Sequence, residues 1–370
     1  MEYIYESNRL CGPWIIWGKK RILNLGGGDI LGFTSNVAFQ KLLSENIFTD
    51  EILNRPRFLS EEENIYKESA RVFSQFKGFE DAILFSDPYT PFLTILESLI
   101  PQGLTLLIDE HFDPSMTSFL NSLTNRITFF PHNSIEQLEK ALSEKNEGLV
   151  AILVQTLYPL SSDFVPLNRI VELSNKNEST LIIFESWADG LVGSNGQGIY
   201  AISSQLPPKA YVFGSLSHIL PFPPSYLMGS RNELNHLREN SITIKSSSNI
   251  SYFQMSILRW FVKTMQSETS LLKKLYDNAN YLRYELLSRR FKILGEFTPL
   301  IPILIGEKEK TTAFRNYLLS NNILVNKIVF PLVPPGKSRT LIIPSVYHIK
   351  DDLDFAIEKI TEAGEFLGII

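Results

Sequence analysis

A histidine and two carboxylates are the residues of this chain best suited to acid–base chemistry. His218 follows two serines, Ser215 and Ser217, and its imidazole could exchange a proton near neutral pH. Glu185 and Asp113 are the carboxylates that could orient such an imidazole. These residue types predict a site for proton transfer if the fold brings them together.

Three aromatic residues form a second candidate group. Tyr89, Phe184 and Trp187 could line a pocket for a ligand or an acyl chain, or they could simply pack into the core. The remaining histidines do not have the spacing of a metal site.

The elements that must position these residues alternate along the chain from about Glu80 to Gly229. The predicted strands are Asp81–Phe85, Leu104–Asp109, Arg126–Phe130, Gly148–Thr156, Thr180–Glu185, Ala210–Gly214 and Ser225–Gly229. The predicted helices between them are Thr90–Ile100, Pro114–Ser122, Ile135–Glu144 and Leu167–Asn175. Continuous apolar strands alternating with helices are typical of a mostly parallel sheet covered on both faces. Ligands of such sheets bind beyond the carboxyl ends of the strands, where the candidate residues lie.

A second, smaller α/β unit follows two long helical patterns, Ser251–Gln266 and Ser267–Ser288. Its predicted elements are strands Leu300–Ile305, Leu324–Ile328 and Ser338–Ile343 and helices Thr311–Asn321 and Lys350–Phe366. We therefore expect an N-terminal segment, residues 1–45, that packs on the small domain. A large domain would span residues 46–288, and the small C-terminal domain would span residues 289–370.

The composition excludes several classes of protein. The 370 residues carry a net charge of −5 with acids and bases well mixed, which argues against nucleic acid as a main partner. Cys11 is the only cysteine, so no intrachain disulfide can form, and a reducing compartment is expected. No signal peptide is recognisable, and no apolar run approaches the roughly 20 residues of a membrane span. A cytoplasmic protein is the expectation.

Six segments, read in order, resemble the α-oxoamine synthases, most closely the 8-amino-7-oxononanoate synthases. They are LNLGGGDILGFT (Leu23–Thr34), ILFSDPY (Ile83–Tyr89), LYPLSSDFVPLNRIVEL (Leu157–Leu173), IIFESWADGLVGSNGQG (Ile182–Gly198), GSLSHIL (Gly214–Leu220) and FPLVPPGKSRTLIIPSVYH (Phe330–His348). The resemblance covers most of the chain and implies the fold of the aspartate aminotransferase-like, fold-type-I pyridoxal-phosphate (PLP) transferases. Members of the family condense an amino acid with an acyl thioester and release carbon dioxide.

The resemblance also shows what this chain lacks. His218 stands at the position of the lysine that binds PLP as a Schiff base, and an imidazole cannot form that bond. Lys209 precedes its strand, at the wrong end for this role, and Lys245 lies beyond a loop of unpredictable path. Covalently bound PLP is therefore not expected.

Other family positions differ as well. Phe184 stands where the family has the aspartate that pairs with the pyridine nitrogen, and Trp187 stands where the same motif ends in histidine. Glu185 could replace the aspartate only if the register slipped by one residue. Asp113 occupies the place of the histidine that stacks on the ring, and His111 could substitute for it.

The phosphate and substrate positions show a mixture of loss and retention. Asp87 and the proline after it replace a Ser-Gly pair, with Tyr89 next, and Ile52–Glu63 replaces a glycine-rich stretch. Ser215 and Ser217 match hydroxyl positions that the family keeps just before the lysine. Arg339 matches the first arginine of the region that grips the amino acid's carboxylate.

Two hypotheses follow from this pattern. The first is a non-catalytic member of the family that acts as a subunit, a scaffold, or a binder of an acyl thioester or acyl carrier. It would form a homodimer, or a heterodimer with a lysine-bearing paralogue. The second is an active acyltransferase, either with an unusual mode of PLP binding or without a cofactor and using His218. The alternative to a functional role is that the His218 side chain only fills the space that the cofactor has vacated.

Overall fold

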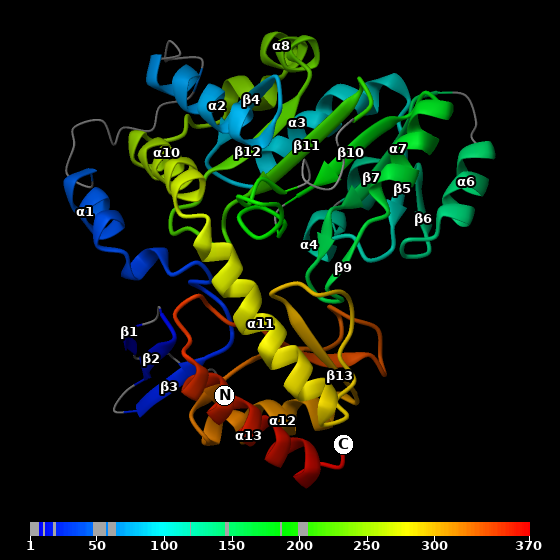
Figure 1. The fold of residues 1–370 in the computed structure, drawn as a ribbon. Coiled ribbons are helices and arrows are strands. Elements are labelled where there is room, and N and C mark those ends of the chain that lie inside the picture. The colour runs from blue at the N-terminus through cyan, green and yellow to red at the C-terminus, as the bar shows by residue number, and fades with distance from the viewer. Residues whose placement is uncertain are drawn as a thin grey trace.

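The computed structural model describes residues 7–9, 12–17, 20–46, 57, 64–118, 120–144, 148–185, 187–198 and 206–370. Figure 1 shows a large unit, built on a central sheet, above a smaller one, with helix α11 (Ser270–Ser288) running down between them. Ile52–Glu63, at the expected glycine-rich position, lies outside the described residues except for Arg57. No helix in the described part of the chain is long and apolar enough to cross a membrane.

The central sheet has seven strands, and six of them run in the same direction. Their order is β4 (Asp81–Phe85), β12 (Ser225–Gly229), β11 (Ala210–Ser215), β10 (Thr180–Phe184), β7 (Val150–Gln155), β5 (Thr105–Asp109) and β6 (Ile127–Phe130). Only β12 runs antiparallel to both of its neighbours. The α/β fold with a mostly parallel sheet is confirmed by these pairings. The strands β7, β10 and β11 are mostly apolar and are buried along their whole length, as is typical of such sheets.

Helices cover both faces of this sheet. One face packs against α2 (Asn64–Lys77), α6 (Ile135–Ser143), α7 (Leu167–Lys176) and α10 (Tyr252–Ser267). The other packs against α3 (Tyr89–Leu99), α4 (Pro114–Thr117), α5 (Leu120–Leu123), α8 (Arg231–Asn240) and α9 (Ile242–Ser246). Side chains of successive strand residues therefore enter two different cores.

The small unit combines the two ends of the chain. Its antiparallel sheet has the order β13 (Ile301–Gly306), β16 (Ser338–Ile342) and β15 (Asn326–Ile328), with helices α12 (Lys308–Ser320) and α13 (Lys350–Phe366). The N-terminal strands β1 (Ser7–Arg9), β2 (Trp14–Trp17) and β3 (Lys20–Asn24) form a second sheet with β14 (Ile323–Leu324). β3 pairs in parallel with β14, so the N-terminal segment lies against the C-terminal part of the chain. The domain boundaries at residues 45 and 288 remain predictions.

Three elements differ from the sequence-based expectation. The predicted helix Pro114–Ser122 is divided into α4 and α5. The predicted strand Leu324–Ile328 is divided at Val325, because β14 pairs with β3 whereas β15 pairs with β16. Helices α1 (Val37–Asn46), α2, α8 and α9 were not expected. Short elements complete the fold: η1 (Phe33–Ser35), η4 (Ile100–Gln102), β8 (Leu157–Tyr158) and β9 (Asp163–Phe164).

Candidate functional site

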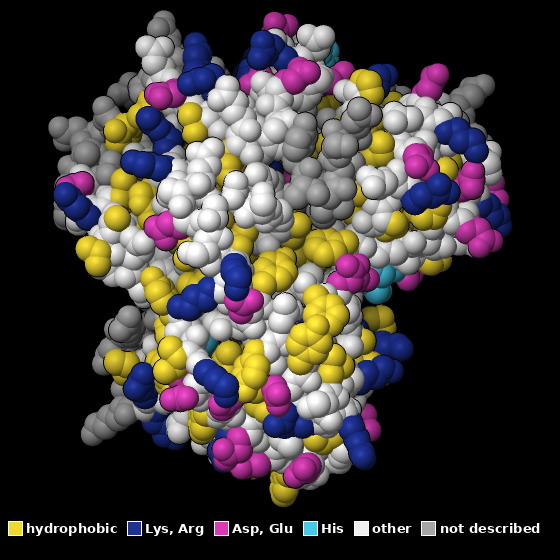
Figure 2. Space-filling model, in the orientation of Figure 1, with side chains coloured by type: hydrophobic (Ala, Val, Ile, Leu, Met, Phe, Trp, Pro, Cys, Tyr) yellow, Lys and Arg dark blue, Asp and Glu magenta, His cyan; other side chains and the backbone are white. Residues whose placement is uncertain are grey.

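A cavity of about 680 Å³ lies between the carboxyl ends of the central strands and the small unit. We call it the cleft cavity. The large unit contributes His111, Asp113, Gln155, Trp187, Ser217 and His218 to its lining, and the rest of the chain contributes Gly26–Gly28, Asn326 and Lys327. Figure 2 shows hydrophobic side chains gathered at the waist between the two units, in the same part of the molecule. The location agrees with the rule for ligand sites in open α/β sheets.

His218 is held in the cleft cavity by a single hydrogen bond to the backbone. Its Nε2–H donates to the carbonyl oxygen of Asp189 at 2.7 Å, and its buried Nδ1 has no hydrogen-bond partner among the described residues. The ring packs beside Trp187, with 5.1 Å between the ring centroids. The bond to Asp189 leaves the lone pair on Nδ1, so the imidazole is arranged as an acceptor at that atom.

The surroundings of His218 make it a weak base. Burial is the largest influence and lowers the pKa of the imidazole to about 4, and the positive charge of Lys77 acts in the same direction. No hydrogen bond joins the ring to Glu185 or Asp113 among the described contacts, so the expected pairing with a carboxylate is absent there. The imidazole is therefore neutral at pH 7 and binds a proton only in acid.

Phe184 lies away from the cleft cavity in a cluster of four phenylalanines. Phe184 and Phe213 stack with 5.0 Å between ring centroids, and Phe213 stacks on Phe92 at 5.1 Å. Phe112 completes the group at 5.9 Å from Phe184. We call these residues the phenylalanine cluster. It explains Phe184 as core packing, which was one of the two alternatives for the aromatic residues.

Asp87 occupies the N-terminus of helix α3. Its Oδ1 accepts hydrogen bonds from the backbone N–H groups of Tyr89 and Thr90, both at 2.9 Å, and its Oδ2 accepts from the Thr90 hydroxyl at 2.6 Å. The carboxylate thus takes the donors that a free helix N-terminus would offer to an anion. Tyr89 is partly exposed at the first position of the helix, and neither residue lines the cleft cavity.

The structure brings four of the predicted site residues together and separates the others. Asp113, Trp187, Ser217 and His218 line the cleft cavity, and Asp113 also caps α4 by accepting the N–H of Ser115 at 2.8 Å. The residues elsewhere are Asp87, Tyr89, Phe184, Ser215 and Arg339.

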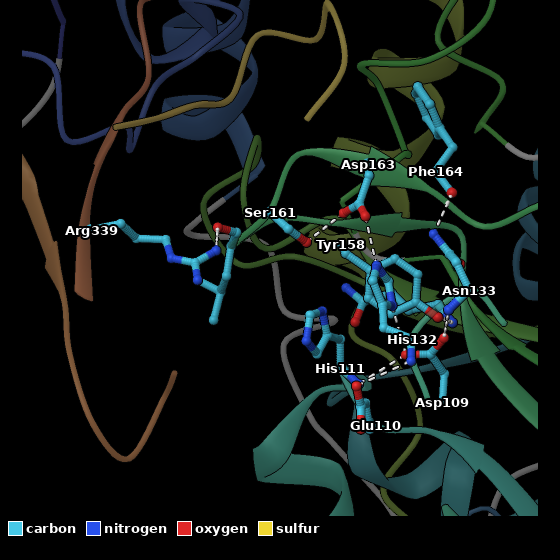
Figure 3. Close-up of polar contacts among 12 residues, drawn as sticks. Asp109, Glu110, His111, His132, Asn133, Tyr158, Ser161, Asp163, Phe164 and Arg339 are labelled. Carbon is cyan, nitrogen blue, oxygen red and sulfur yellow. Dashed lines mark hydrogen bonds and ion pairs between the residues drawn. The ribbon is translucent and has the colours of Figure 1, made fainter. Parts of the chain in front are cut away.

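Arg339 instead lines an adjoining cavity of about 490 Å³ that shares His111 and Leu160 with the cleft cavity. Its guanidinium donates to the carbonyl oxygens of Leu160 at 2.9 Å and Lys337 at 3.0 Å. Figure 3 shows the side chain entering from the small unit.

His132, which stacks on the cavity-lining residue His111, bridges two aspartates (Figure 3). His132 Nδ1 lies 2.8 Å from Asp109 Oδ1, and Nε2 lies 2.6 Å from Asp163 Oδ2. Burial opposes the charge, but the hydrogen bonds and charges of the two aspartates outweigh it and raise the pKa of His132 to about 9. His111 stacks on this ring at 4.0 Å, and burial together with the neighbouring cation lowers its pKa. His132 is thus a structural cation at neutral pH.

The contact of His132 with the two aspartates predicts that the free energy of unfolding falls as pH rises. The folded state holds the His132 proton up to about pH 9, whereas an unfolded histidine loses it near 6.5, so the stabilisation is full below pH 6.5 and disappears through pH 9. We expect the free energy of unfolding to drop by about 2–3 kcal/mol from this source. Urea unfolding at pH 6.0 and 9.5 measures the drop. His132→Gln should remove most of it, and an equal drop in the variant would contradict the assignment.

A second buried ionic group is linked to His218 through Asp189. The backbone carbonyl of Asp189 accepts the His218 hydrogen bond, and its carboxylate contacts Lys77. Lys77 Nζ contacts Glu185 Oε2 at 2.7 Å, Asp189 Oδ1, and the hydroxyl of Tyr226 at 3.2 Å. Tyr226 in turn donates to Asp189 Oδ2 at 2.6 Å. All four side chains are buried, and we call them the buried lysine cluster. Glu185 therefore points away from the cleft cavity, and burial raises the pKa of its carboxyl group, whereas the charge of Lys77 acts in the opposite direction.

Sequence reasoning did not identify several of these residues. Lys77 lies four residues after Phe73 on the buried face of α2, and a lysine at such a position is the signal that could have exposed the cluster. Gln155 is the last residue of β7 and the last but one of the predicted strand Gly148–Thr156, so it lies at the strand end where ligands of such sheets bind. Nothing in the local sequence distinguishes Lys327 or His132. Among the described residues, no group of His, Cys, Asp or Glu could hold a metal ion.

Comparisons with known proteins agree with this fold. A family model described as aminotransferase class I and II matches residues 20–350. An 8-amino-7-oxononanoate synthase of Coprothermobacter proteolyticus is 26% identical over 364 residues, covering 97% of this chain and 92% of the relative. The synthase of the same name from Thermosipho melanesiensis is 25% identical over 374 residues, covering 100% of this chain and 95% of the relative.

Two solved structures show how far the fold is shared. A serine palmitoyltransferase from S. paucimobilis with a bound PLP–myriocin aldimine matches with a TM-score of 0.89 at 20% identity, covering 98% of this chain and 92% of that one. An 8-amino-7-oxononanoate synthase from Francisella tularensis matches with a TM-score of 0.78 at 14% identity, covering 94% and 99%. At these identities the structures establish the fold.

Proposed function

This chain belongs to the aminotransferase class I and II family, among its α-oxoamine synthases, and from that membership we propose that it is a synthase-like protein whose cofactor site no longer holds PLP. The family depends on PLP, and one structural neighbour carries it as an aldimine. The proposal is that this chain keeps the acyltransferase fold without the cofactor's chemistry. Three features of the structure support it.

The proposal rests first on His218, which the resemblance places at the family's lysine position, and on the contacts that hold it. Its Nε2–H is engaged with the carbonyl of Asp189 and its ring lies against Trp187. No lysine of the large unit lines the cleft cavity, where the described residues contribute only Lys327, from strand β15 of the small unit. A cofactor placed at the family position would meet no amine there.

The phenylalanine cluster is unsuited to a charged pyridine ring. The position that would pair with the pyridine nitrogen is Phe184, whose ring is enclosed by Phe112 and Phe213. Glu185 cannot take over, because it is buried in contact with Lys77 on the other side of the strand. A pyridinium would have no counter-charge, which is costly in a buried site.

The N-terminus of helix α3 is unsuited to a phosphate. Asp87 already satisfies the N–H groups of Tyr89 and Thr90. A phosphate at this place would have to displace a carboxylate and would also be repelled by it.

A non-catalytic role as a subunit, a scaffold, or an acyl or acyl-carrier binder fits these features best. In this role the chain would assemble as a homodimer or with a lysine-bearing paralogue. The cofactor-free enzyme has less support, because His218 has a pKa of about 4 and no carboxylate contact among the described residues.

Restoring the lysine alone should not restore the cofactor. We expect His218→Lys, incubated with PLP, to show less than about one tenth of the aldimine absorbance of a stoichiometric complex, because Phe184 and Asp87 still oppose the pyridinium and the phosphate. The measurement is the visible spectrum after gel filtration. Lys308→Met, a substitution at an exposed position outside the site, is the control variant. A full aldimine on the new lysine would show that one substitution accounts for the loss and that the rest of the site is intact.

A further inference from the structure

The cleft cavity contains a buried amide with no partner. Gln155 ends strand β7 and is 1% exposed, and its Nε2 makes no hydrogen bond within the described part of the chain. The backbone of the same residue is satisfied, since its N–H donates to the Tyr158 hydroxyl at 3.3 Å. A buried donor left unpaired is costly, so an unpaired amide N–H in the lining of a cavity is a candidate donor to an oxygen of a bound molecule.

A lysine of the small unit, Lys327, lines the same cavity and is exposed to solvent at its edge. Lys327 lies on β15, whose position is fixed by pairing with β16 and by the bond from Asn326 Nδ2 to the carbonyl oxygen of Gly26 at 2.7 Å. No ion pair or hydrogen bond of its ammonium appears among the described contacts. Among the described residues of the lining, Asp113 is the carboxylate, and it caps α4 by accepting the N–H of Ser115. The Lys327 ammonium therefore has no ion-pair partner in the described lining and is available to an acidic ligand.

The remaining walls suit a short apolar chain. Ile30, Leu160, Ile328 and Leu332 are among the apolar residues of the lining. Gly28 lies in the lining, and a Cβ added to it would meet nothing within 4 Å. The backbone at this residue therefore leaves the adjacent space open.

We propose that the cleft cavity binds a small organic acid. Lys327 takes the carboxylate, Gln155 donates Nε2–H to a ligand oxygen, and the apolar walls hold the carbon chain. One ammonium and one amide donor match the two oxygens of a carboxylate, whereas a phosphate presents more charge and more acceptors than they can satisfy. The inference rests on the proposed function, because it requires a cavity that no cofactor fills.

Hexanoate is a suitable probe, used with chain whose spectrum shows no bound PLP. Isothermal titration should give a dissociation constant of about 1 mM or below, and hexanamide, which lacks the charge, should bind at least about tenfold more weakly. Lys327→Met and Gln155→Leu should each weaken hexanoate binding by about tenfold. Lys308→Met, an exposed lysine of α12 outside the cavity, should bind as the unchanged chain does. Circular dichroism of each variant confirms that it is folded.

Several outcomes would overturn the inference. They are no hexanoate binding up to about 10 mM, equal binding of hexanamide, inorganic phosphate that competes at equal concentration, or undiminished binding by both cavity variants. The cofactor is tested separately. A chain that forms an aldimine with PLP refutes the proposed function, whereas a chain that binds neither PLP nor hexanoate refutes this inference alone.

Discussion

We expect Lys77→Met to lower the free energy of unfolding by about 3–5 kcal/mol, because the substitution leaves Glu185 and Asp189 buried without their cation. The lysine is 1% exposed, so water cannot replace the lost charge without a local opening of the structure. Methionine has a similar volume, which keeps the loss of packing small. Urea unfolding followed by circular dichroism measures the change.

Two further variants separate charge from packing in this prediction. Lys273→Met removes an exposed lysine paired with Asp277 on the surface and should change stability by less than about 0.5 kcal/mol. Combining Lys77→Met with Glu185→Gln and Asp189→Asn removes the uncompensated carboxylates and should recover most of the loss. A triple variant as unstable as the single one would mean that packing, and not charge, holds the cluster together.

The second large effect is expected at the phenylalanine cluster. Phe184→Ala should cost about 3–5 kcal/mol, since it removes a ring that is 4% exposed and in contact with Phe112 and Phe213. The matched control is Phe129→Ala on β6, where the side chain is 52% exposed and the expected change is within about 0.5 kcal/mol. Urea unfolding followed by circular dichroism measures the stability of both variants.

The stability of Phe184→Ala bears on function as well as on folding. A cost near zero would show that the ring does not support the core and that the position is free to accept a polar partner for a ligand. A large cost means that the cluster is part of the core, so that placing an aspartate at this position would bury a charge among phenylalanines.

Much of the fold was predictable from the sequence because most of its strands are continuous apolar runs. Thr180–Glu185 was predicted and Thr180–Phe184 is observed, and the strand Ser225–Gly229 agrees at both ends. Helices were harder where their polarity is high. Arg231–Asn240 forms α8 with Leu234 and Leu237 as its buried residues, which gives little apolar periodicity to detect.

The site was predictable only in part, because its decisive contacts join distant residues. Motif positions pointed to His218 and Trp187, and both residues line the cleft cavity. The pairing of Lys77 with Glu185 spans 108 residues, and no local pattern reports it. Lys327 and Gln155 come from different units, and only the folded chain shows that they line the same cavity. Alternation along β10 did predict that Glu185 would face away from Phe184, as observed.

The most direct test of the central claim is the visible spectrum of the purified chain after incubation with PLP, before and after borohydride reduction. A spectrum without aldimine absorbance, and a reduced chain without added cofactor mass on any lysine, is the predicted result. In the proposed function His218 stands in place of the amine, and Phe184 and Asp87 oppose the ring and the phosphate. An aldimine band that reduction fixes stoichiometrically on one lysine, whether Lys245 or Lys327, would show that the cofactor site has been rebuilt and would contradict the account.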